Sequence, residues 1–507
     1  MCKPWKPGDS IPEATVSTVT VAYPLAKSMV TSATCLPSAV FIWVVSLPAL
    51  EDPDDVVDVA ELLEPWLAQA LIARAGIATK PIAAANCLIM NRLYPSDARH
   101  KPRVRGTAWC CQSGAQVIPR RYGACDERDS MVHRDHGSTE GLLQELLWSY
   151  GPCGQEDAVR AVCTRELQPL VDDMWSDGAG NLIGYIAADA NGARAGEHRH
   201  RSTTTPGFGA ATRVMAHMDE LSMLVKRVEP DGTLHLTQLG TMYPGNFGLG
   251  PVAVLGENET FTAVLTLGSE HTTKESQRIW QTKPDQGDQA LDWDHVYVFT
   301  GRSPEDLDAA GVRPGTRLCV DRSKRTLVDV GDYVGCYFLD DRAAVTALLR
   351  AARLLREGGE RPADDAYLVF TTNEEIGGVG GTYASATLPG TLTLALEVGP
   401  TEREYATTVS GGPIVGYSDA LCVYDKDVAD RLMRIATDRG FSPQAAVLGA
   451  FESDASHSKA NGLTPRAGLL CLPTLSTHGY EVMARGAIEA MSAVIVDFLL
   501  SPAAEKS

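Results

Sequence analysis

Apolar runs and helical patterns alternate along the chain from Ser138 onward. Strands are predicted where short apolar runs lie between turn residues, at 182–187, 213–216, 367–370, 391–398 and 467–472. Helices are predicted where apolar residues recur at helical spacing, after 138 and over 155–174 (bent or split at Pro169), 343–357 and 482–500. This alternation predicts an α/β fold.

The segment 226–332 has a different pattern. Its strand-like runs are short and are separated by Gly, Pro and Asp, and the polar stretch 269–294 predicts a loop. Because this β-rich segment interrupts the α/β pattern, we expect a domain inserted into an α/β domain that comprises 136–225 and 333–507.

Residues 1–135 carry little periodicity. The exception is Val56 to Ala75, which has apolar residues at helical spacing but contains Pro65. We expect an atypical extension that is either poorly ordered or translated from a start placed too far upstream, with Met131 as the alternative start. The stretch from 188 to 206 is predicted to be an exposed loop.

Composition and charge exclude several classes of partner. The 507 residues are 44% hydrophobic and 21% charged, as in globular proteins, and carry a formal net charge of -19. This charge argues against nucleic acid and anionic membranes as partners, and no apolar run is long enough to span a membrane. The twelve cysteines include no C-x-x-C pair, so we interpret them as reduced thiols of a cytoplasmic protein.

Paired carboxylates follow the strand predicted at 367–370. Glu374 and Glu375 come directly after Thr371-Thr372-Asn373 and directly before a glycine-rich segment. The carboxyl end of a buried strand is where α/β sheets place functional sites, and two adjacent ionised carboxylates favour a bound cation. Since neighbouring side chains of an extended segment point to opposite sides, one glutamate could bind a metal while the other faces a water. The alternative interpretation is a solvated turn.

Two further acidic segments lie at predicted strand ends. His217 ends the strand that begins at 213, and Asp219 is two residues further on, where a carboxylate could orient a metal-bound imidazole. Asp340 and Asp341 lie where a strand meets the next helix. Acidic residues at that position either cap the helix or bridge two cations, and both interpretations stay open.

The last two predicted strands add another carboxylate and another histidine. Glu397 lies in an otherwise apolar strand, where a charge is costly unless it is paired, and His478 follows the final strand. Imidazole and carboxylate ligands without thiolates suit Zn²⁺, Co²⁺ or Mn²⁺. The sequence therefore predicts a metal site from candidates that lie near strand ends: His217, Asp340, Glu375, Glu397 and His478.

Five motifs together resemble the glutamyl-aminopeptidase, or tetrahedral-aminopeptidase, family of dinuclear-zinc metallopeptidases. They are AHMDE at 216–220, LDDR at 339–342, NEEIGGVGG at 373–381, ALEVGP at 395–400 and LSTHGYEV at 475–482. The resemblance covers about 137–500. It implies a zinc-exopeptidase-like mixed sheet flanked by helices, with 226–332 as an inserted assembly domain. It also implies a homo-oligomeric aminopeptidase that acts on peptides.

The same resemblance implies two divalent metal ions, zinc or alternatively cobalt or manganese. Asp340 would bridge both ions and would be joined to Asp341 by a cis peptide. The other ligands would divide into pairs, His217 with Glu397 for one ion and Glu375 with His478 for the other.

Three further roles follow from the resemblance. Glu374 would be the general base, Asp219 would orient His217, and Asp454 would lie in a loop near the substrate. The chain departs from the family pattern at two places. The family commonly has Asp where Glu397 stands, and the segment around Asp454 reads FESDAS rather than a glycine-rich sequence, so the substrate pocket is expected to differ.

Two other functions fit the same residues. A di-zinc deacylase or a carboxypeptidase would use the same fold and metals on a different substrate, and assays of free-amine peptides against N-acylated amino acids separate them from an aminopeptidase. A non-catalytic assembly protein would need no metal, so metal analysis of the purified protein distinguishes it.

Overall fold

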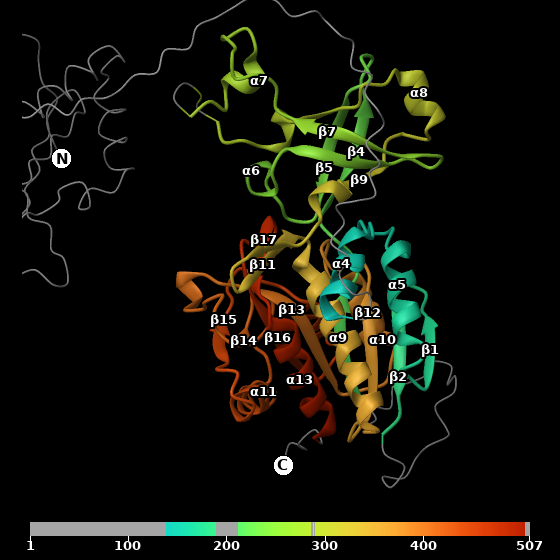
Figure 1. Cartoon of the computed structure of the whole chain (residues 1–507), viewed down its shortest axis with the longest axis vertical. Helices are drawn as coiled ribbons and strands as arrows, with labels where there is room; N and C mark the ends of the chain where they lie inside the picture. The colour runs from blue at the N-terminus through green and yellow to red at the C-terminus, as the bar shows by residue number, and fades with distance from the viewer. Residues whose placement is uncertain (1–137, 189–210, 285–286, 288, 502–507) are drawn as a thin grey trace, which may run out of the picture. The chain divides into compact units, whose positions relative to one another are not determined.

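The computed structural model describes residues 138–188, 211–284, 287 and 289–501. Within these residues the strands form an 11-stranded sheet and a closed barrel (Figure 1). The predictions for residues 1–135, including the helix from Val56 to Ala75 and the start at Met131, lie outside the described residues, as does nearly all of the loop predicted at 188–206.

The large sheet is mixed. Its strands are β1 (Asp173–Ser176), β2 (Leu182–Ile186), β3 (Ala211–His217), β10 (Val328–Val330), β11 (Tyr333–Tyr337), β12 (Asp365–Thr371), β13 (Leu392–Pro400), β14 (Ile414–Ser418), β15 (Gln444–Val447), β16 (Arg466–Leu475) and β17 (Tyr480–Ala484). The main order is β1-β2-β12-β3-β13-β16-β17-β11-β10, and β14 joins β15 to β16. The central strands β12, β3, β13 and β16 are parallel, and β2 and β17 join them antiparallel. The predicted mixed α/β sheet is therefore confirmed.

Helices cover both faces of this sheet. One face carries α4 (Thr139–Trp148), α5 (Asp157–Leu167), α9 (Leu339–Gly358), α11 (Lys426–Asp438) and α13 (Ala487–Leu500), and the other carries α10 (Val379–Thr387) and α12 (Asp454–Ala460). Figure 1 shows α9 and α13 side by side across the sheet. Alternate strand residues divide between the faces, since Val214 packs in the core under α9 and Met215 in the core under α10. No helix in the described part of the chain is long and apolar enough to cross a membrane.

The closed barrel occupies the β-rich segment between β3 and β11. Its strands are β4 (Ser222–Val228), β5 (Leu234–Leu239), β6 (Gly250–Leu255), β7 (Thr260–Thr266), β8 (Tyr297–Phe299) and β9 (Arg317–Val320), and its short helices are α6 (Pro244–Phe247), α7 (Gln277–Trp280) and α8 (Pro304–Ala309). Inward and outward residues alternate along β7, where Phe261, Ala263 and Leu265 are buried. The polar stretch predicted to be a loop contains α7. The assembly role of this segment remains a prediction.

Three predicted elements differ from the structure. The helix predicted over 155–174 ends at Leu167 and is followed by β1, because Pro169 has no amide hydrogen with which to continue it. The helix predicted over 482–500 begins at Ala487, because the residues before it pair with β11 and β16 as β17. The segment around Asp454, expected to be a loop, contains the start of α12, whose N-cap Ser453 accepts a hydrogen bond from the backbone N–H of Ser456 at 3.2 Å.

A buried ion triad joins the segments that follow β3 and β11. Glu220 is fully buried, and its carboxylate pairs with the guanidinium of Arg342 at 2.7 Å and with that of Arg325 at 3.0 Å. Burial alone would raise the pKa of Glu220, but the two guanidinium groups outweigh burial and lower it. The triad therefore depends on an ionised Glu220.

We expect Glu220→Ala to lower the free energy of unfolding by about 3–5 kcal/mol, because two buried guanidinium groups lose their carboxylate. Urea denaturation at pH 7 measures this change. The matched control is Glu145→Ala, which removes a partly exposed pair with Arg165 and should cost about 0–1 kcal/mol. Equal stability of the two variants would contradict the role of the triad.

The same triad predicts a pH dependence of the wild-type protein. Because the pKa of Glu220 is lower in the folded state, its contribution is present above the unfolded pKa of about 4.3 and is lost as the pH falls through the folded value. The difference in stability between wild type and Glu220→Ala should therefore shrink in acid. A difference in stability that stays constant from pH 7 to pH 3 would contradict the predicted pH dependence.

Candidate active site

The candidate residues meet at one edge of the sheet. The parallel register aligns Thr371 of β12 with His217 of β3, so the carboxyl ends of these strands lie side by side. Glu397 lies inside β13, three residues before its end, and is paired in register with Cys471 of β16. An α/β sheet places its ligands at this edge.

One group of possible metal ligands comprises His217, Asp340, Asp341 and Glu397. All four residues are buried, and each offers a ligand atom within 4.8 Å of the others. Nε2 of His217 lies 3.1 Å from Oδ1 of Asp340 and 3.6 Å from Oε2 of Glu397. The peptide bond between Asp340 and Asp341 is cis, as the family resemblance implies.

A second group comprises Asp340, Glu375 and His478. Nε2 of His478 lies 3.6 Å from Oδ2 of Asp340 and 3.8 Å from Oε2 of Glu375. Asp340 belongs to both groups, with Oδ1 toward His217 and Oδ2 toward His478. A carboxylate in this position is able to bridge two cations.

Backbone carbonyls orient both histidines. Nδ1 of His217 lies 3.2 Å from the carbonyl oxygen of Asp219, and Nδ1 of His478 lies 2.6 Å from that of Thr241 in the β-rich segment. With Nδ1–H donating to these carbonyls, each imidazole presents an unprotonated Nε2 to the carboxylates, as a metal-binding histidine requires.

The carboxylate of Asp219 holds the turn that carries the paired glutamates. Its Oδ1 is 3.6 Å from the imidazole of His217, farther than the carbonyl of the same residue. It accepts hydrogen bonds from the backbone N–H of Glu374 at 3.0 Å and of Glu375 at 3.1 Å, and from the thiol of Cys153 at 3.3 Å. Asp219 thus connects three segments of the site.

Buried oxygens without partners show that the site fits cations. Within the described residues, Oε1 of Glu375 and Oδ1 of Asp341 are buried and accept no hydrogen bond. Burial, opposed by His478, raises the pKa of Glu375 to about 7, and burial with neighbouring carboxylates raises that of Glu397. A divalent cation would satisfy these oxygens and remove the repulsion between the carboxylates.

A cavity of about 590 Å³ opens onto both ligand groups. Glu374 lines it together with Asp340 and His478. Burial, opposed by His217, raises the pKa of Glu374 well above its ordinary value. A carboxyl group in this environment is able to hold a proton near neutral pH.

Asp454 lies behind this cavity rather than in its lining. Its side chain is 2% exposed, and its Oδ2 accepts a hydrogen bond from the hydroxyl of Thr371 at 2.5 Å. A Cβ at Gly381 would come within 2.3 Å of Oδ1 of Asp454, so this glycine permits the close approach of α10. The predicted contact of Asp454 with substrate remains a prediction.

One site residue was not singled out from the sequence. Glu481 in β17 is 1% exposed, and its carboxylate accepts hydrogen bonds from the backbone N–H of Asp340 at 3.0 Å and of His478 at 3.1 Å. It thereby fixes two of the three segments that carry the ligands of the second group, those of Asp340 and His478. A signal was present, since Glu481 lies in the LSTHGYEV motif three residues after His478, but its other partner, Asp340, is 141 residues away.

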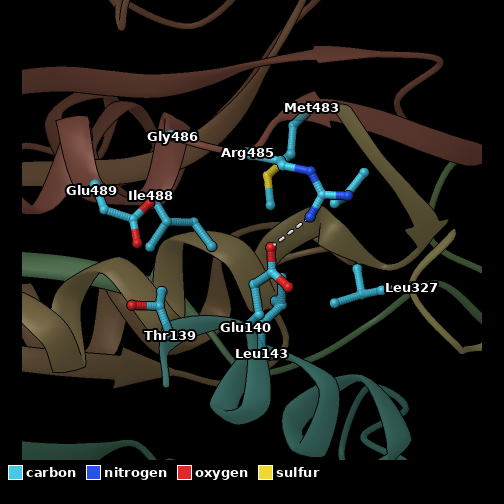
Figure 2. Close-up of a pocket in the computed structure, with 10 residues that line it drawn as sticks. Thr139, Glu140, Leu143, Leu327, Met483, Arg485, Gly486, Ile488 and Glu489 are labelled. Atoms are coloured by element: carbon cyan, nitrogen blue, oxygen red, sulfur yellow. Dashed lines mark hydrogen bonds and ion pairs between the residues drawn. The ribbon is translucent and has the colours of Figure 1, made fainter. Parts of the chain in front are cut away.

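A smaller cavity of about 250 Å³ lies between α4, β17 and α13. Figure 2 shows Arg485 in this cavity, turned toward Glu140, and the two side chains form an ion pair at 2.8 Å. Its other lining residues include Leu143, Met483 and Ile488. This cavity contains no group of metal ligands among the described residues and lies apart from the candidate site.

Comparison with known proteins identifies related chains. A family model described as M42 glutamyl aminopeptidase matches residues 203–494. The lysyl aminopeptidase of Pyrococcus furiosus is 26% identical over 262 residues, which are 51% of this chain and 65% of that protein, so the match spans less than two-thirds of its length. A putative aminopeptidase of Acetivibrio thermocellus is 22% identical over 346 residues, covering 66% of this chain and 91% of that protein.

Solved structures share the fold. An aminopeptidase from the archaeon Desulfurococcus kamchatkensis superposes with a TM-score of 0.61 at 22% identity, covering 72% of this chain and 95% of that one. The TET1 peptidase of Pyrococcus horikoshii, described as assembling into a tetrahedron or a large octahedral shell, superposes with a TM-score of 0.59 at 21% identity. That match covers 72% of this chain and 100% of the other.

Proposed function

The chain belongs to the M42 glutamyl aminopeptidase family, and on that premise we propose that it is a metal-dependent aminopeptidase that removes N-terminal residues from peptides. The observation that carries the proposal is the position of Asp340. Its two carboxylate oxygens face two separate ligand groups in one cavity, which Glu374 also lines.

The donor set suits two divalent cations, with zinc preferred and cobalt or manganese as alternatives. His217 and Glu397 would hold one ion, Glu375 and His478 the other, and Asp340 both. When bound, the ions would polarise the scissile carbonyl and lower the pKa of a water molecule. Asp341, the remaining member of the first group, accepts a hydrogen bond from the backbone N–H of His217 at 3.1 Å.

Glu374 acts as the general base. Its carboxylate takes a proton from the attacking water as that water adds to the scissile carbonyl carbon, and it then delivers the proton to the departing amine nitrogen. The C–N bond breaks as the amine leaves. The hydrogen bond from the backbone of Glu374 to Asp219 holds the base in position during both transfers.

The protein acts as a homo-oligomer in this proposal. The TET1 peptidase, which has the same fold, is described as forming closed shells. The β-rich segment would provide contacts between subunits. Light scattering after size-exclusion chromatography tests this proposal. We expect a mass above that of one 54.3 kDa chain, and a monomer at micromolar concentration would contradict the proposal.

The experiment that tests the proposed activity compares a free-amine tetrapeptide with its N-acetylated form. The full-length chain should release the N-terminal residue of the free peptide, lose activity on chelation and regain it when zinc, cobalt or manganese is returned. Cleavage of the acetylated peptide at an equal rate, or release of the C-terminal residue, would instead indicate a deacylase or a carboxypeptidase.

Asp219→Asn should weaken metal binding by about 10–100-fold, the usual cost of changing a residue that positions the metal ligands. The amide keeps the shape of the side chain but turns an N–H group toward the backbone N–H of Glu374 or Glu375. Competition with a fluorescent zinc chelator measures the affinity. Asp438→Asn, on the exposed end of α11, serves as the control, and equal affinities of the two variants would contradict the role of Asp219.

A further inference from the structure

We propose that Asn246, in the β-rich segment, is a positioning residue that holds His478 and thereby sets the affinity of the second metal ion. This inference rests on the proposed function, in which the two ligand groups bind two ions. It gives the β-rich segment a role inside the metal site, in addition to the predicted contacts between subunits.

The two histidines lie in different surroundings. His217 ends the buried strand β3, and its side chain is 1% exposed. His478 lies in the turn between β16 and β17, and its side chain is 37% exposed. Because an exposed side chain has space to rotate, the imidazole of His478 needs contacts from outside its own turn to stay directed at the metal site.

The backbone of this turn has an unfavourable conformation. Ser476 has a φ of 62° and His478 a φ of 61°, both in the left-handed region that few residues other than glycine adopt. Such a conformation persists only where the surrounding structure holds it, and it is common at functional sites. The contacts made to this turn therefore determine where the imidazole of His478 lies.

Asn246 provides contacts to this turn from the β-rich segment. Its side-chain amide donates to the carbonyl of His478 at 3.2 Å and to that of Thr477 at 3.4 Å. A Cβ at Gly479 would come within 2.9 Å of the same amide nitrogen, so this glycine permits the close approach of Asn246. Since the carbonyl of Thr241 lies 2.6 Å from Nδ1 of His478, the β-rich segment contacts both the backbone and the imidazole of this ligand.

The short helix α6, which carries Asn246, is itself anchored. The buried ring of Phe247 lies 6.2 Å from the ring of Trp293 and 6.3 Å from that of Phe338, measured between centroids. Nε1 of Trp293 donates to the carbonyl of Met242 at 2.9 Å. Phe338 comes two residues before Asp340, so these contacts fix α6 against the segment that carries the shared ligand.

The same part of the β-rich segment also borders the other ligand of the second group. A Cβ at Gly240 would come within 3.3 Å of the carbonyl oxygen of Glu375 and within 3.4 Å of its Cβ. His217 and Glu397 of the first group instead lie in β3 and β13 of the large sheet. A change at Asn246 is therefore expected to weaken the second ion and not the first.

The test measures zinc binding to the metal-free, full-length chain by competition with fluorescent chelators of graded affinity. In N246A two carbonyls of the turn lose their donor, and the second ion should bind about tenfold more weakly, the usual effect of losing a group that orients a ligand. The first ion should keep its wild-type affinity.

N258A is the matched control. The side-chain amide of Asn258 donates to the carbonyl of Ala309 at 3.1 Å, so this variant also loses an amide-to-carbonyl hydrogen bond of the β-rich segment. Among the described residues, Asn258 is not part of the cavity lining. N258A should keep the wild-type affinity for both ions.

Two ligand variants assign the measured affinities to the two ions. H478A should keep only the first ion tightly bound, so adding N246A to it should have no further effect. H217A should keep only the second ion, and adding N246A to it should still weaken binding about tenfold. Thermal unfolding establishes that each variant is folded, and the comparison with H478A decides alone if H217A does not fold.

The outcomes separate this inference from the proposed function. Equal weakening of both ions in N246A, unchanged affinity for both, or a further loss when N246A is added to H478A would overturn the inference and leave the proposed function standing. A wild-type chain that binds two ions but hydrolyses no free-amine peptide would overturn the proposed function and leave the role of Asn246 standing.

Discussion

The Glu374→Gln variant is expected to hydrolyse peptides about 10²–10⁴-fold more slowly than the wild-type enzyme while keeping its metal ions. Glutamine has the shape of the glutamate but does not accept the proton of the attacking water. The ligands are untouched, and the backbone hydrogen bond from residue 374 to Asp219 is preserved. Turnover and metal content are therefore measured on the same preparation, by steady-state kinetics and by elemental analysis.

Glu357→Gln is the matched control, because Glu357 is exposed near the end of α9, away from the cavity lining. It should keep both wild-type turnover and wild-type metal content. If Glu374→Gln hydrolysed peptides at the wild-type rate with two ions bound, Glu374 would not be the general base. If it lost its metals, the loss of activity would have to be assigned to binding.

Asp340→Asn is expected to lose affinity for both metal ions by more than about 100-fold, since changing a residue that only positions a ligand already costs about 10–100-fold. Asp340 is the member shared by both ligand groups, with one oxygen toward His217 and the other toward His478. Asparagine preserves its size and its backbone hydrogen bond to Glu481 but removes the charge and one acceptor. Elemental analysis after dialysis against a chelator measures both ions together.

His478→Ala provides the comparison, because His478 belongs to the second group alone. This variant should bind one of the two ions more weakly and keep the other bound. Thermal unfolding of both variants establishes that they are folded before the metal content is compared. Retention of two tightly bound ions by Asp340→Asn would show that this residue does not bridge them.

The architecture of the site could be predicted from local sequence to a large extent. Short apolar runs end in His217 and shortly before Glu374, and parallel strands bring such ends to the same edge of a sheet. The types of the side chains then indicate a hard or borderline divalent cation. Both inferences need only the period of the pattern and the chemistry of single residues.

The remaining features depend on partners that are distant along the chain. The carboxylate of Glu481 accepts a hydrogen bond from the backbone of Asp340, 141 residues away. The carbonyl of Thr241 accepts one from the imidazole of His478, 237 residues away. The last three residues of β17, 482–484, are predicted as helix because the apolar pattern continues into α13, and the pairing of β17 with β11 decides the outcome. Local patterns carry no information on such contacts.

The segment around Asp454 illustrates the same limit on a smaller scale. FESDAS has the small polar residues of a loop, but Ser453 and Ser456 satisfy each other's backbone and cap α12. The capped helix buries Asp454 against Thr371 of β12. The two serines, three residues apart, indicate a helix start in the sequence. The burial of the Asp454 carboxylate has no such local indication.

The most direct measurement is anomalous X-ray scattering from crystals of the full-length, zinc-loaded protein. The account predicts two zinc peaks in one cavity, each about 2.0–2.2 Å from a carboxylate oxygen of Asp340, with His217 at one peak and His478 at the other. A zinc-loaded crystal with no peak at Asp340, or with its zinc bound elsewhere, would contradict it.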